Sequence, residues 1–376
     1  RPRKIGASDH AEEAAAPVDA ASAPPAIGAG NVIGTIAYVA VIAAAIIGPD
    51  SAAANVAPLA VLVGWWIGLP ILCLVAGDVM SAINPFQIPA ALAERFVGRR
   101  LRASAEPPPW MGAALLASFA WFFLAYHTPG SPRALAVYLT AYAVVVVVAA
   151  LMWGRGWLAR REGFAGLSAA VANLSWRSTS RVVPGVAPLM VVWIGTTAFD
   201  AVTSTTFWAD VVGTSAGWGA TSFASIGLLW LVAIVAAAYI GAVKVAGLLG
   251  AAGEPPLLRP LGLALVPLAA AWFIAHDITL LMAEGQNLIV LLSDPIGRGW
   301  DLFGTIDNTV DFGIVEETWV RWLQLGLLAA GHVLTVVIGH DVALRLRART
   351  AAVQVTWCLA ALSAVSFVAA VMLVMG

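Results

Sequence analysis

Acidic and imidazole side chains stand inside apolar runs of this sequence, where charged groups are costly and typically serve a function. Asp200 lies in the stretch GTTAFDAVTSTTFW, and His276 with Asp277 lies in WFIAHDITLLMAEGQ. Asp200 and His276 each precede the expected end of their run by about eight residues, or ~12 Å of helix. Carboxylates and imidazoles are suitable ligands for Zn, Mn or Co, so these residues predict a divalent metal site.

Each of these residues also has a structural interpretation. Thr196 and Ser204 stand four positions before and after Asp200, so their hydroxyls share its helix face and could satisfy a buried carboxylate. His276 could be a core histidine with a backbone partner. The residue types alone do not choose between the two interpretations.

Two further candidates extend the predicted site. Glu284 follows Asp277 by seven positions and shares its helix face. His332, in GHVLTVVIGHD, lies about thirteen residues from its boundary, or ~20 Å deep, so only tilted helices would bring it to the other candidates. We expect Asp200, His276 and His332 to be the metal ligands, and these three with Glu284 to be the catalytic set. No compact motif such as H-E-x-x-H accompanies them.

Several other polar residues favour structural roles beside turns or at the ends of runs. Expected as helix caps, ion-pair members or interfacial groups are Asp50, Asp78, His127, His340 and Asp341. The two cysteines, Cys73 and Cys358, lie in apolar runs and are expected to be packing residues rather than a disulfide or zinc pair.

The elements that must position these residues follow from composition. The chain is 61% hydrophobic and only 11% charged, with a mean hydropathy of +0.88. A soluble domain carries about 25% charged residues, which is the amount its surface needs. We therefore predict an all-α, polytopic transmembrane helix bundle whose partner is the lipid bilayer, with membrane protein partners left open. No basic arm or aromatic-basic module predicts nucleic-acid binding.

Apolar runs of about 20 residues predict about nine spans. Their expected ranges are 30–48, 57–77, 110–127, 133–153, 187–208, 222–250, 260–284, 318–341 and 351–374. With the N-terminus inside and the C-terminus outside, all but three of the 20 Lys and Arg residues fall on the cytoplasmic side. The three exceptions are Arg133, Arg298 and Arg321. The positive-inside rule predicts this orientation.

The sequence predicts one membrane domain with flanking segments. Residues 1–29 are rich in Ala, Pro and Gly and are expected to be a cytoplasmic linker from a missing N-terminal segment. Residues 30–376 are expected to form a single transmembrane domain. The amphipathic connections 85–102 and 155–176 are expected to lie along the inner interface.

An outer capping segment is expected near residues 285–317. Gly285 permits a helix break after Glu284, and the following NLIVLL is too short to span the membrane. We expect NLIVLL to fold back or lie at the interface as part of a lid. SDPIGRGWDLFGT then supplies turns, so the segment would cover a cavity that opens to the outer side.

The sequence resembles bacterial integral-membrane proteins identified as fenitrothion hydrolases, which are organophosphate triester hydrolases. The motifs that carry the likeness are GDVMSAINPF, FDAVTSTTFW, EGQNLIVLLSDPIGRGWDLFGT and GHVLTVVIGHD. The likeness covers most of the chain and is most specific from EGQ through GWDLFGT. It implies a multi-pass protein of the bacterial inner membrane that hydrolyses a small-molecule substrate, and it assigns no catalytic residue.

Three functions are consistent with these patterns. The first is an intramembrane, metal-assisted hydrolase of the phosphotriester type that takes its substrate from the outer side. The second is a proton- or ion-coupled transporter, for which His340 and Asp341 would complete an inner pathway. The third is a non-catalytic or redox subunit of a membrane complex, although no C-x-x-C-H haem motif is present.

Overall fold

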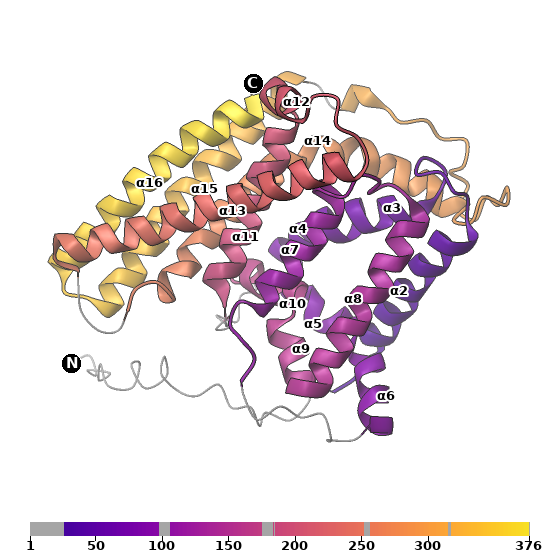
Figure 1. Cartoon of the computed structure of the whole chain (residues 1–376), viewed down its shortest axis with the longest axis horizontal. Helices are drawn as coiled ribbons and strands as arrows, with labels where there is room; N and C mark the ends of the chain where they lie inside the picture. Colours follow the sequence, from indigo (N-terminus) through magenta and orange to yellow (C-terminus); the bar gives the residue numbers. More distant parts are fainter. Residues whose placement is uncertain are drawn as a thin grey trace.

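The computed structural model describes residues 26–97, 106–174, 183, 185–251, 256–314 and 317–375. Within these ranges the chain forms helices and turns without strands, and the predicted all-α class is confirmed (Figure 1). The helices are α2 (Ala29–Ile47), α3 (Val56–Leu59), η1 (Ala60–Ile67), α4 (Gly68–Ala76), α5 (Val79–Ile83), α6 (Gln87–Val97), α7 (Met111–Leu124), α8 (Pro132–Trp153), α9 (Arg155–Arg161), α10 (Gly163–Ala172), α11 (Val186–Thr203), α12 (Thr206–Val212), α13 (Trp218–Ala246), η3 (Gly247–Ala251), η4 (Pro260–Ala264), α14 (Leu265–Ser293), η5 (Phe312–Ile314), α15 (Glu317–Leu346) and α16 (Arg349–Met375).

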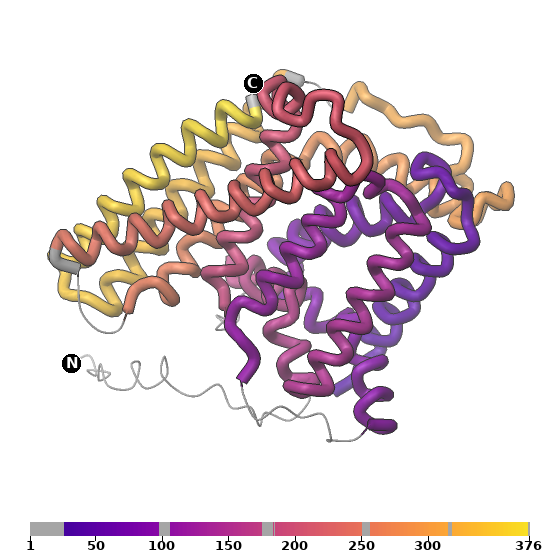
Figure 2. The backbone as a smooth tube through the Cα atoms, viewed as in Figure 1, coloured from indigo at the N-terminus to yellow at the C-terminus, as the bar shows by residue number. Residues whose placement is uncertain are grey.

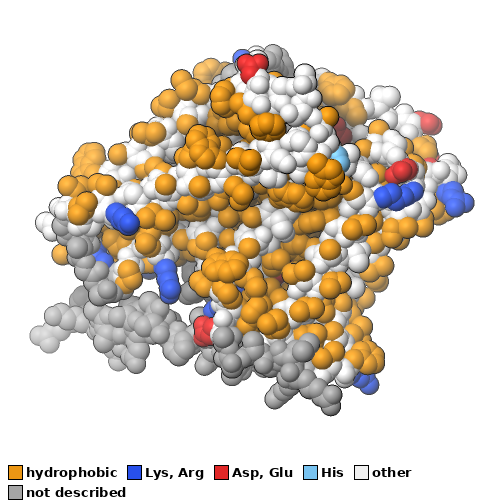
Figure 3. Space-filling model, in the orientation of Figure 1, with side chains coloured by type: hydrophobic (Ala, Val, Ile, Leu, Met, Phe, Trp, Pro, Cys, Tyr) orange, Lys and Arg blue, Asp and Glu red, His pale blue; other side chains and the backbone are white. Residues whose placement is uncertain are grey.

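Eight helical segments in the described part of the chain are long and apolar enough to cross a bilayer. They account for eight of the nine predicted spans. The remaining one, residues 110–127, is the 14-residue helix α7, whose ~21 Å length falls short of a ~30 Å hydrocarbon core. Hydrophobic side chains cover most of the face seen in Figure 3, as expected for a surface in contact with lipid.

The N-terminal helices meet around an aromatic cluster. The ring of Phe119 on α7 lies 5.2 Å from Trp66 on η1 and 4.9 Å from Phe164 on α10, measured between ring centroids. Trp66 also contacts Phe273 of α14 at 5.4 Å, so the cluster joins the N-terminal helices to α14. In Figure 2 the indigo and magenta helices of the N-terminal part lie on one side of the molecule, and α13, α15 and α16 lie on the other.

Side chains satisfy several helix ends in this bundle, where the low-dielectric surroundings make unpaired backbone groups costly. Asn55 caps α3, and Asp78 caps α5 through its bond from the N–H of Ser81, as predicted. Arg133 donates to the carbonyls of Ala45 and Gly48 and so covers the C-terminal end of α2.

Helix α10 corrects one prediction. Residues 155–176 were expected to lie along the inner interface, but nine of the ten α10 residues are buried inside the bundle. The first turn of α10 is capped by Glu162, which accepts from the N–H of Ala165 at 3.0 Å and from the hydroxyl of Tyr142. Alanine and glycine dominate α10, and their small size lets it fit between larger helices.

Hydroxyl groups end helix α11 three residues after Asp200. The side chains of Thr203, Ser204 and Thr205 donate to the carbonyls of the residues three positions earlier, at 2.6, 2.8 and 2.6 Å. These bonds take up carbonyls that would otherwise continue the helix ladder. The short helix α12 then begins, with Thr205 as its N-cap.

Helix α14, which packs against α11, is much longer than α11. It runs without a break from Leu265 to Ser293, so the predicted break at Gly285 and the folding back of NLIVLL are wrong. Gly285 is tolerated in the helix because its φ angle stays in the ordinary region and its neighbours are good helix formers. The expected lid segment is instead the second half of a single long helix.

Residues 294–314 do fold back over the end of α14. The hydroxyl of Ser293 lies 2.7 Å from that of Thr305, and Thr305 also donates to the carbonyl of Ile289 at 3.0 Å. Farther along, Gln286 bonds both the N–H and the carbonyl of Asp311, at 2.9 and 3.1 Å. Residues 294–314, which we call the capping segment, are therefore tied to α14 at three successive turns, whereas residues 285–293 of the predicted segment belong to α14 itself. That the segment covers a cavity on the outer side stays a prediction.

Some predictions concern residues outside the described ranges. These are most of the linker 1–29 and the basic residues Arg99, Arg100, Arg102, Arg177 and Arg181. Which end of the bundle faces the cytoplasm also stays a prediction, since no membrane is present to set the direction.

Candidate metal centre

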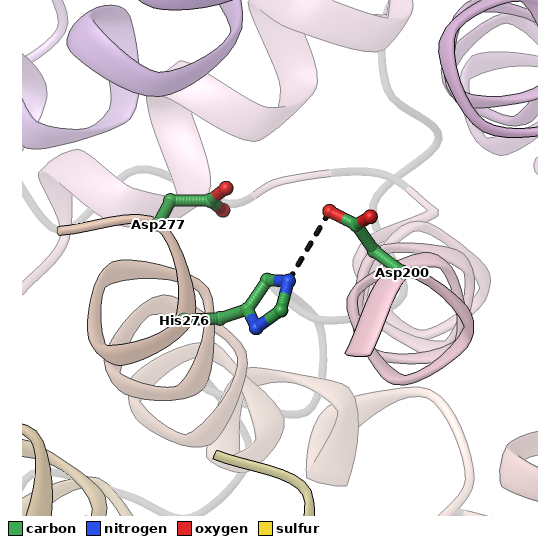
Figure 4. A group of neighbouring side chains, drawn as sticks. All are labelled: Asp200, His276 and Asp277. Carbon is green, nitrogen blue, oxygen red and sulfur yellow. Dashed lines mark ion pairs between the residues drawn. The ribbon is translucent and has the colours of Figure 1, made fainter. Parts of the chain in front are cut away.

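Asp200 and His276 come together between α11 and α14. The Oδ2 atom of Asp200 lies 3.2 Å from Nε2 of His276 (Figure 4). Asp277 completes the group, because one potential ligand atom from each of the three residues lies within 4.8 Å of the other two. We call Asp200, His276 and Asp277 the acidic triad.

The packing of two helices brings these side chains to one place. Trp193 of α11 and Phe273 of α14 contact each other with ring centroids 5.0 Å apart, which fixes the faces that the two helices present. Asp200 is seven residues after Trp193, and Asp277 is four residues after Phe273, so each lies on nearly the same helix face as its aromatic residue. His276 and Asp277 are consecutive and therefore flank the Asp200 carboxylate from two directions about 100° apart.

The hydroxyls near Asp200 do not satisfy its carboxylate. Thr196 donates to the carbonyl of Trp193 at 2.9 Å, and Ser204 donates to the carbonyl of Ala201 at 2.8 Å. Both hydroxyls are thus used within their own helix. The structural interpretation of Asp200 as a carboxylate bonded by these neighbours is wrong, and His276 is its partner instead.

Among the described residues, no Lys or Arg forms an ion pair with the carboxylates of the triad, whose only basic partner is His276. Asp277 is 5% exposed, and its carboxylate accepts no hydrogen bond from the described residues. The charges that act on His276 and Asp277 in that part of the chain are those of Asp200 and of each other. A buried carboxylate and a half-buried one beside a single imidazole need a proton or a cation to be stable in low-dielectric surroundings.

His332 is not part of the triad, contrary to the predicted convergence. Its Nδ1 lies 2.7 Å from the carbonyl of Leu328, and its Nε2 lies 3.1 Å from the hydroxyl of Ser366 on α16. Both ring nitrogens are therefore engaged in tying α15 to itself and to α16. His332 is 6% exposed. It is therefore a core histidine with a backbone partner, which was the structural alternative considered for His276.

The register of α14 against α15 explains why His332 lies elsewhere. Gln324 donates to the carbonyl of Ala275 at 2.8 Å, so Gln324 is the α15 residue level with His276. A Cβ on Gly331 would lie 2.9 Å from the carbonyl oxygen of Pro267, which places His332 beside the start of α14. His332 is eight residues beyond Gln324, or ~12 Å along the helix, and side chains cannot bridge that offset.

Glu284 lies on α14 above the triad. It is seven residues beyond Asp277 on the same face, or ~10 Å along the helix axis. Its Oε2 accepts a bond from the side chain of Asn287 at 3.1 Å. The structure leaves Glu284 outside the group of potential ligands, and its predicted catalytic role stays a prediction.

The other two histidines within the described ranges, His127 and His340, have local partners. The Nδ1 of His340 lies 2.7 Å from the hydroxyl of Thr356, and that of His127 lies 3.1 Å from the hydroxyl of Thr221. His340 therefore joins α15 to α16 rather than forming the expected cap. The ring of His127 lies beside that of Trp218, a tryptophan that is 66% exposed. Such a position is expected of an interfacial group.

Asp277 and Gln324 are the residues that sequence reasoning missed. Asp277 was noted for its position but left out of the ligand set, although its adjacency to His276 was a usable signal. Gln324 gave no signal, because a single amide in an apolar run has no distinctive spacing. Only the register of two helices shows that it contacts the backbone just before His276.

Comparisons with protein-family models, curated proteins and solved structures found no match to this chain.

Proposed function

We propose that this multi-pass membrane protein binds a divalent metal ion at the acidic triad and uses it to hydrolyse a neutral phosphotriester. The observation that carries the proposal is the convergence of Asp200, His276 and Asp277 from two helices that are long and apolar enough to span a membrane. Three protein ligands with further positions open to substrate and water is the usual arrangement of a catalytic zinc site.

The charge count supports a divalent cation in particular. Two ionised aspartates and a neutral imidazole carry a charge of about −2, which an ion such as Zn²⁺, Mn²⁺ or Co²⁺ would cancel. The resulting neutral site would face low-dielectric surroundings at little cost. Such a site favours an uncharged substrate, because an anion would bring back an uncompensated charge.

The chemistry divides between the metal and the protein. A bound ion would lower the pKa of a water molecule and polarise a phosphoryl oxygen. Asp200 and Asp277 hold their carboxylates on two sides of His276, so one of them could accept a proton from the attacking water. The likeness of four motifs to fenitrothion hydrolases supports a phosphotriester as the substrate class.

A metal analysis of the purified protein tests the first half of the proposal. We expect about one equivalent of Zn, Mn or Co in the wild type, and loss of metal affinity by at least ~100-fold in His276→Ala and Asp277→Asn. Asp341→Asn is the matched control, because Asp341 is a helical aspartate outside the triad. Full metal content in both triad variants would contradict the metal site.

Hydrolysis of diethyl 4-nitrophenyl phosphate tests the second half. The wild type should release 4-nitrophenol, a chelator should stop the release, and added metal should restore it. A protein that binds metal at the triad without any hydrolysis of this triester would contradict the hydrolase and leave the metal centre intact.

A proton- or ion-coupled transporter is the second candidate. The unpartnered carboxylate of Asp277 favours it, because such a group can take up and release a proton. Transport also needs a polar route to the other membrane face. Next to His340, the side chain of Leu359 packs closely against Gly339. Proton flux into liposomes that is lost in Asp277→Asn would decide for this function.

A further inference from the structure

We propose that the acidic triad opens to the hydrocarbon core of the bilayer beside Thr279 and Leu280, so that ligands reach it from the lipid phase. Both residues are exposed and lie one helical turn above His276. Leu280 is only about 40° of helix rotation away from His276. The identity of the ligand, a neutral phosphotriester, rests on the proposed function, whereas the opening itself does not.

Burial along α14 changes abruptly at the triad. Ten of the thirteen residues from Leu265 to Asp277 are buried, and the next buried residue after Asp277 is Ser293. The cause is the end of α11: its hydroxyl-rich turn closes the helix at Thr203, so α14 has no α11 neighbour above that level. The triad therefore lies where α14 passes from a mostly buried half to a half whose residues are mostly partly exposed.

The exposed fractions of the triad agree with an opening at this level. The side chain of Asp200 is 34% exposed and that of His276 is 20% exposed. A fully enclosed pair would show neither value. In Figure 4 the side chains of His276 and Asp200 point toward each other from the two helices, with Asp277 beside them.

The surface around this opening is apolar rather than water-like. The large side chains exposed on the second half of α14 are Leu280, Ile289 and Leu292. The longer polar side chains there are partly exposed and have hydrogen-bond partners, since Gln286 bonds to Asp311 and Asn287 bonds to Glu284. A water-filled channel would instead expose polar side chains along its wall. Thr279 and Leu280 also stand near the midpoint of the 29-residue α14, far from either end.

Collision measurements on a spin label test the opening without relying on activity. The label is placed at Leu280→Cys in a Cys358→Ala background, since Cys73 is fully buried and should remain unlabelled. The protein is reconstituted into phosphatidylcholine vesicles, and collisions with oxygen, which concentrates in lipid, are compared with those of a water-soluble nickel chelate. We expect oxygen to dominate at position 280.

Two control positions calibrate the measurement. Val333→Cys should report lipid, because Val333 is a 62% exposed residue in the span α15. Asp307→Cys should report water, because Asp307 is exposed in the capping segment. Position 280 should match Val333. A match to Asp307 would show an aqueous recess, and low collision with both agents would show an occluded site; either result overturns the proposal.

A substrate series links the opening to the proposed function. In Leu280→Trp, the larger ring should raise the KM for dibutyl 4-nitrophenyl phosphate several-fold more than the KM for the dimethyl ester. Leu292→Trp, farther along α14, is the control that should change neither value. If no triester is hydrolysed but position 280 contacts lipid, the proposed reaction fails and the opening stands. Equal effects on both esters would count against passage at this position.

Discussion

Asp277 is the residue that distinguishes a metal centre from an ordinary ion pair. Asp200 and His276 alone would form a compensated pair, as many buried histidines do. Asp277 adds a second carboxylate that is 5% exposed and has no hydrogen-bond donor in the described part of the chain. Because an uncompensated buried charge costs several kcal/mol, a group of this kind persists where a cation or a proton serves it.

Replacing each histidine in turn should separate a ligand from a structural residue. His332→Ala should lower the free energy of unfolding by about 2 kcal/mol, since it removes the bonds to Leu328 and Ser366 and leaves an unfilled volume. The metal content of the folded fraction should not change. His276→Ala should do the opposite, losing metal with a smaller effect on the metal-free protein.

Thermal unfolding of metal-free protein and metal analysis of the folded fraction measure the two effects. Ser366→Ala serves as a control for His332, because it removes one partner of the same bond and should give a smaller loss of stability. Loss of metal in His332→Ala with unchanged stability would reverse the assignment of the two histidines.

At the scale of elements, the site depends on how α14 is held by its neighbours. Gln324 of α15 donates to the carbonyl of Ala275, which directly precedes His276. Gly331 allows the two helices to approach closely one turn and more below, where any side chain would clash with Pro267. These contacts fix the rotation of α14, and with it the direction in which His276 and Asp277 point.

Gln324→Leu should therefore weaken the metal site without touching a ligand. We expect a loss of about 1 kcal/mol of stability for the missing hydrogen bond and roughly a 10-fold loss of metal affinity, as for other outer contacts of metal sites. A titration of the metal-free protein with Co²⁺, followed by its absorption spectrum, measures the affinity and reports any change of geometry. Gln354→Leu on α16 is the matched control. An unchanged Co²⁺ affinity in Gln324→Leu would show that α14 keeps its rotation without this contact.

The capping segment should depend on pH through Asp294. Desolvation acts to raise the pKa of this carboxyl, but the backbone N–H groups of Arg298 and Gly299 that donate to it outweigh this and lower the pKa. A depressed pKa means that Asp294 stabilises the turn above the ordinary carboxyl pKa of about 4. That stability is lost as the pH falls through the lowered pKa.

Proteolysis of the capping segment at different pH values checks this expectation. The wild type should become more susceptible between residues 294 and 305 only in strongly acidic buffer. Asp294→Asn should be susceptible at neutral pH as well, with little further change on acidification. Equal protection of both proteins at neutral pH would show that the turn does not need the carboxylate.

At the scale of the whole molecule, the protein is a bundle whose surface is matched to lipid and whose interior holds few charges. The described helices leave large apolar side chains such as Val137, Leu229 and Val365 on the outside. The triad lies inside this bundle at the junction of two helices from distant parts of the chain. Which membrane face lies nearer to the triad and the capping segment depends on the orientation of the whole bundle.

The orientation can be tested by labelling single cysteines in intact cells. With the N-terminus inside, Asp307→Cys should react with a membrane-impermeant maleimide from outside, and Arg160→Cys should react only after the membrane is permeabilised. The physical reason is that Lys and Arg residues favour the cytoplasmic side, and most of them are expected on the side opposite the capping segment. Labelling of Arg160→Cys in intact cells together with protection of Asp307→Cys would reverse the orientation.

The sequence by itself determined the class, the spans and two members of the site. Hydrophobic runs of membrane length follow directly from composition, because a chain with 11% charged residues cannot cover its surface in water. Asp200 and His276 were found because an ionisable residue inside such a run is rare and costly. The end of α11 is also encoded locally, in the hydroxyls of Thr203 to Thr205.

The tertiary structure alone decided which candidates meet. His332 and Gln324 lie on the same helix, and only the register of α14 against α15 places Gln324 beside His276 and His332 ~12 Å away. Gly285, by contrast, predicts a helix break but lies inside the continuous helix α14, with φ in the ordinary region. Local propensity is worth about 1 kcal/mol per residue, whereas helix packing sums many contacts, so packing sets register and continuity where the two compete.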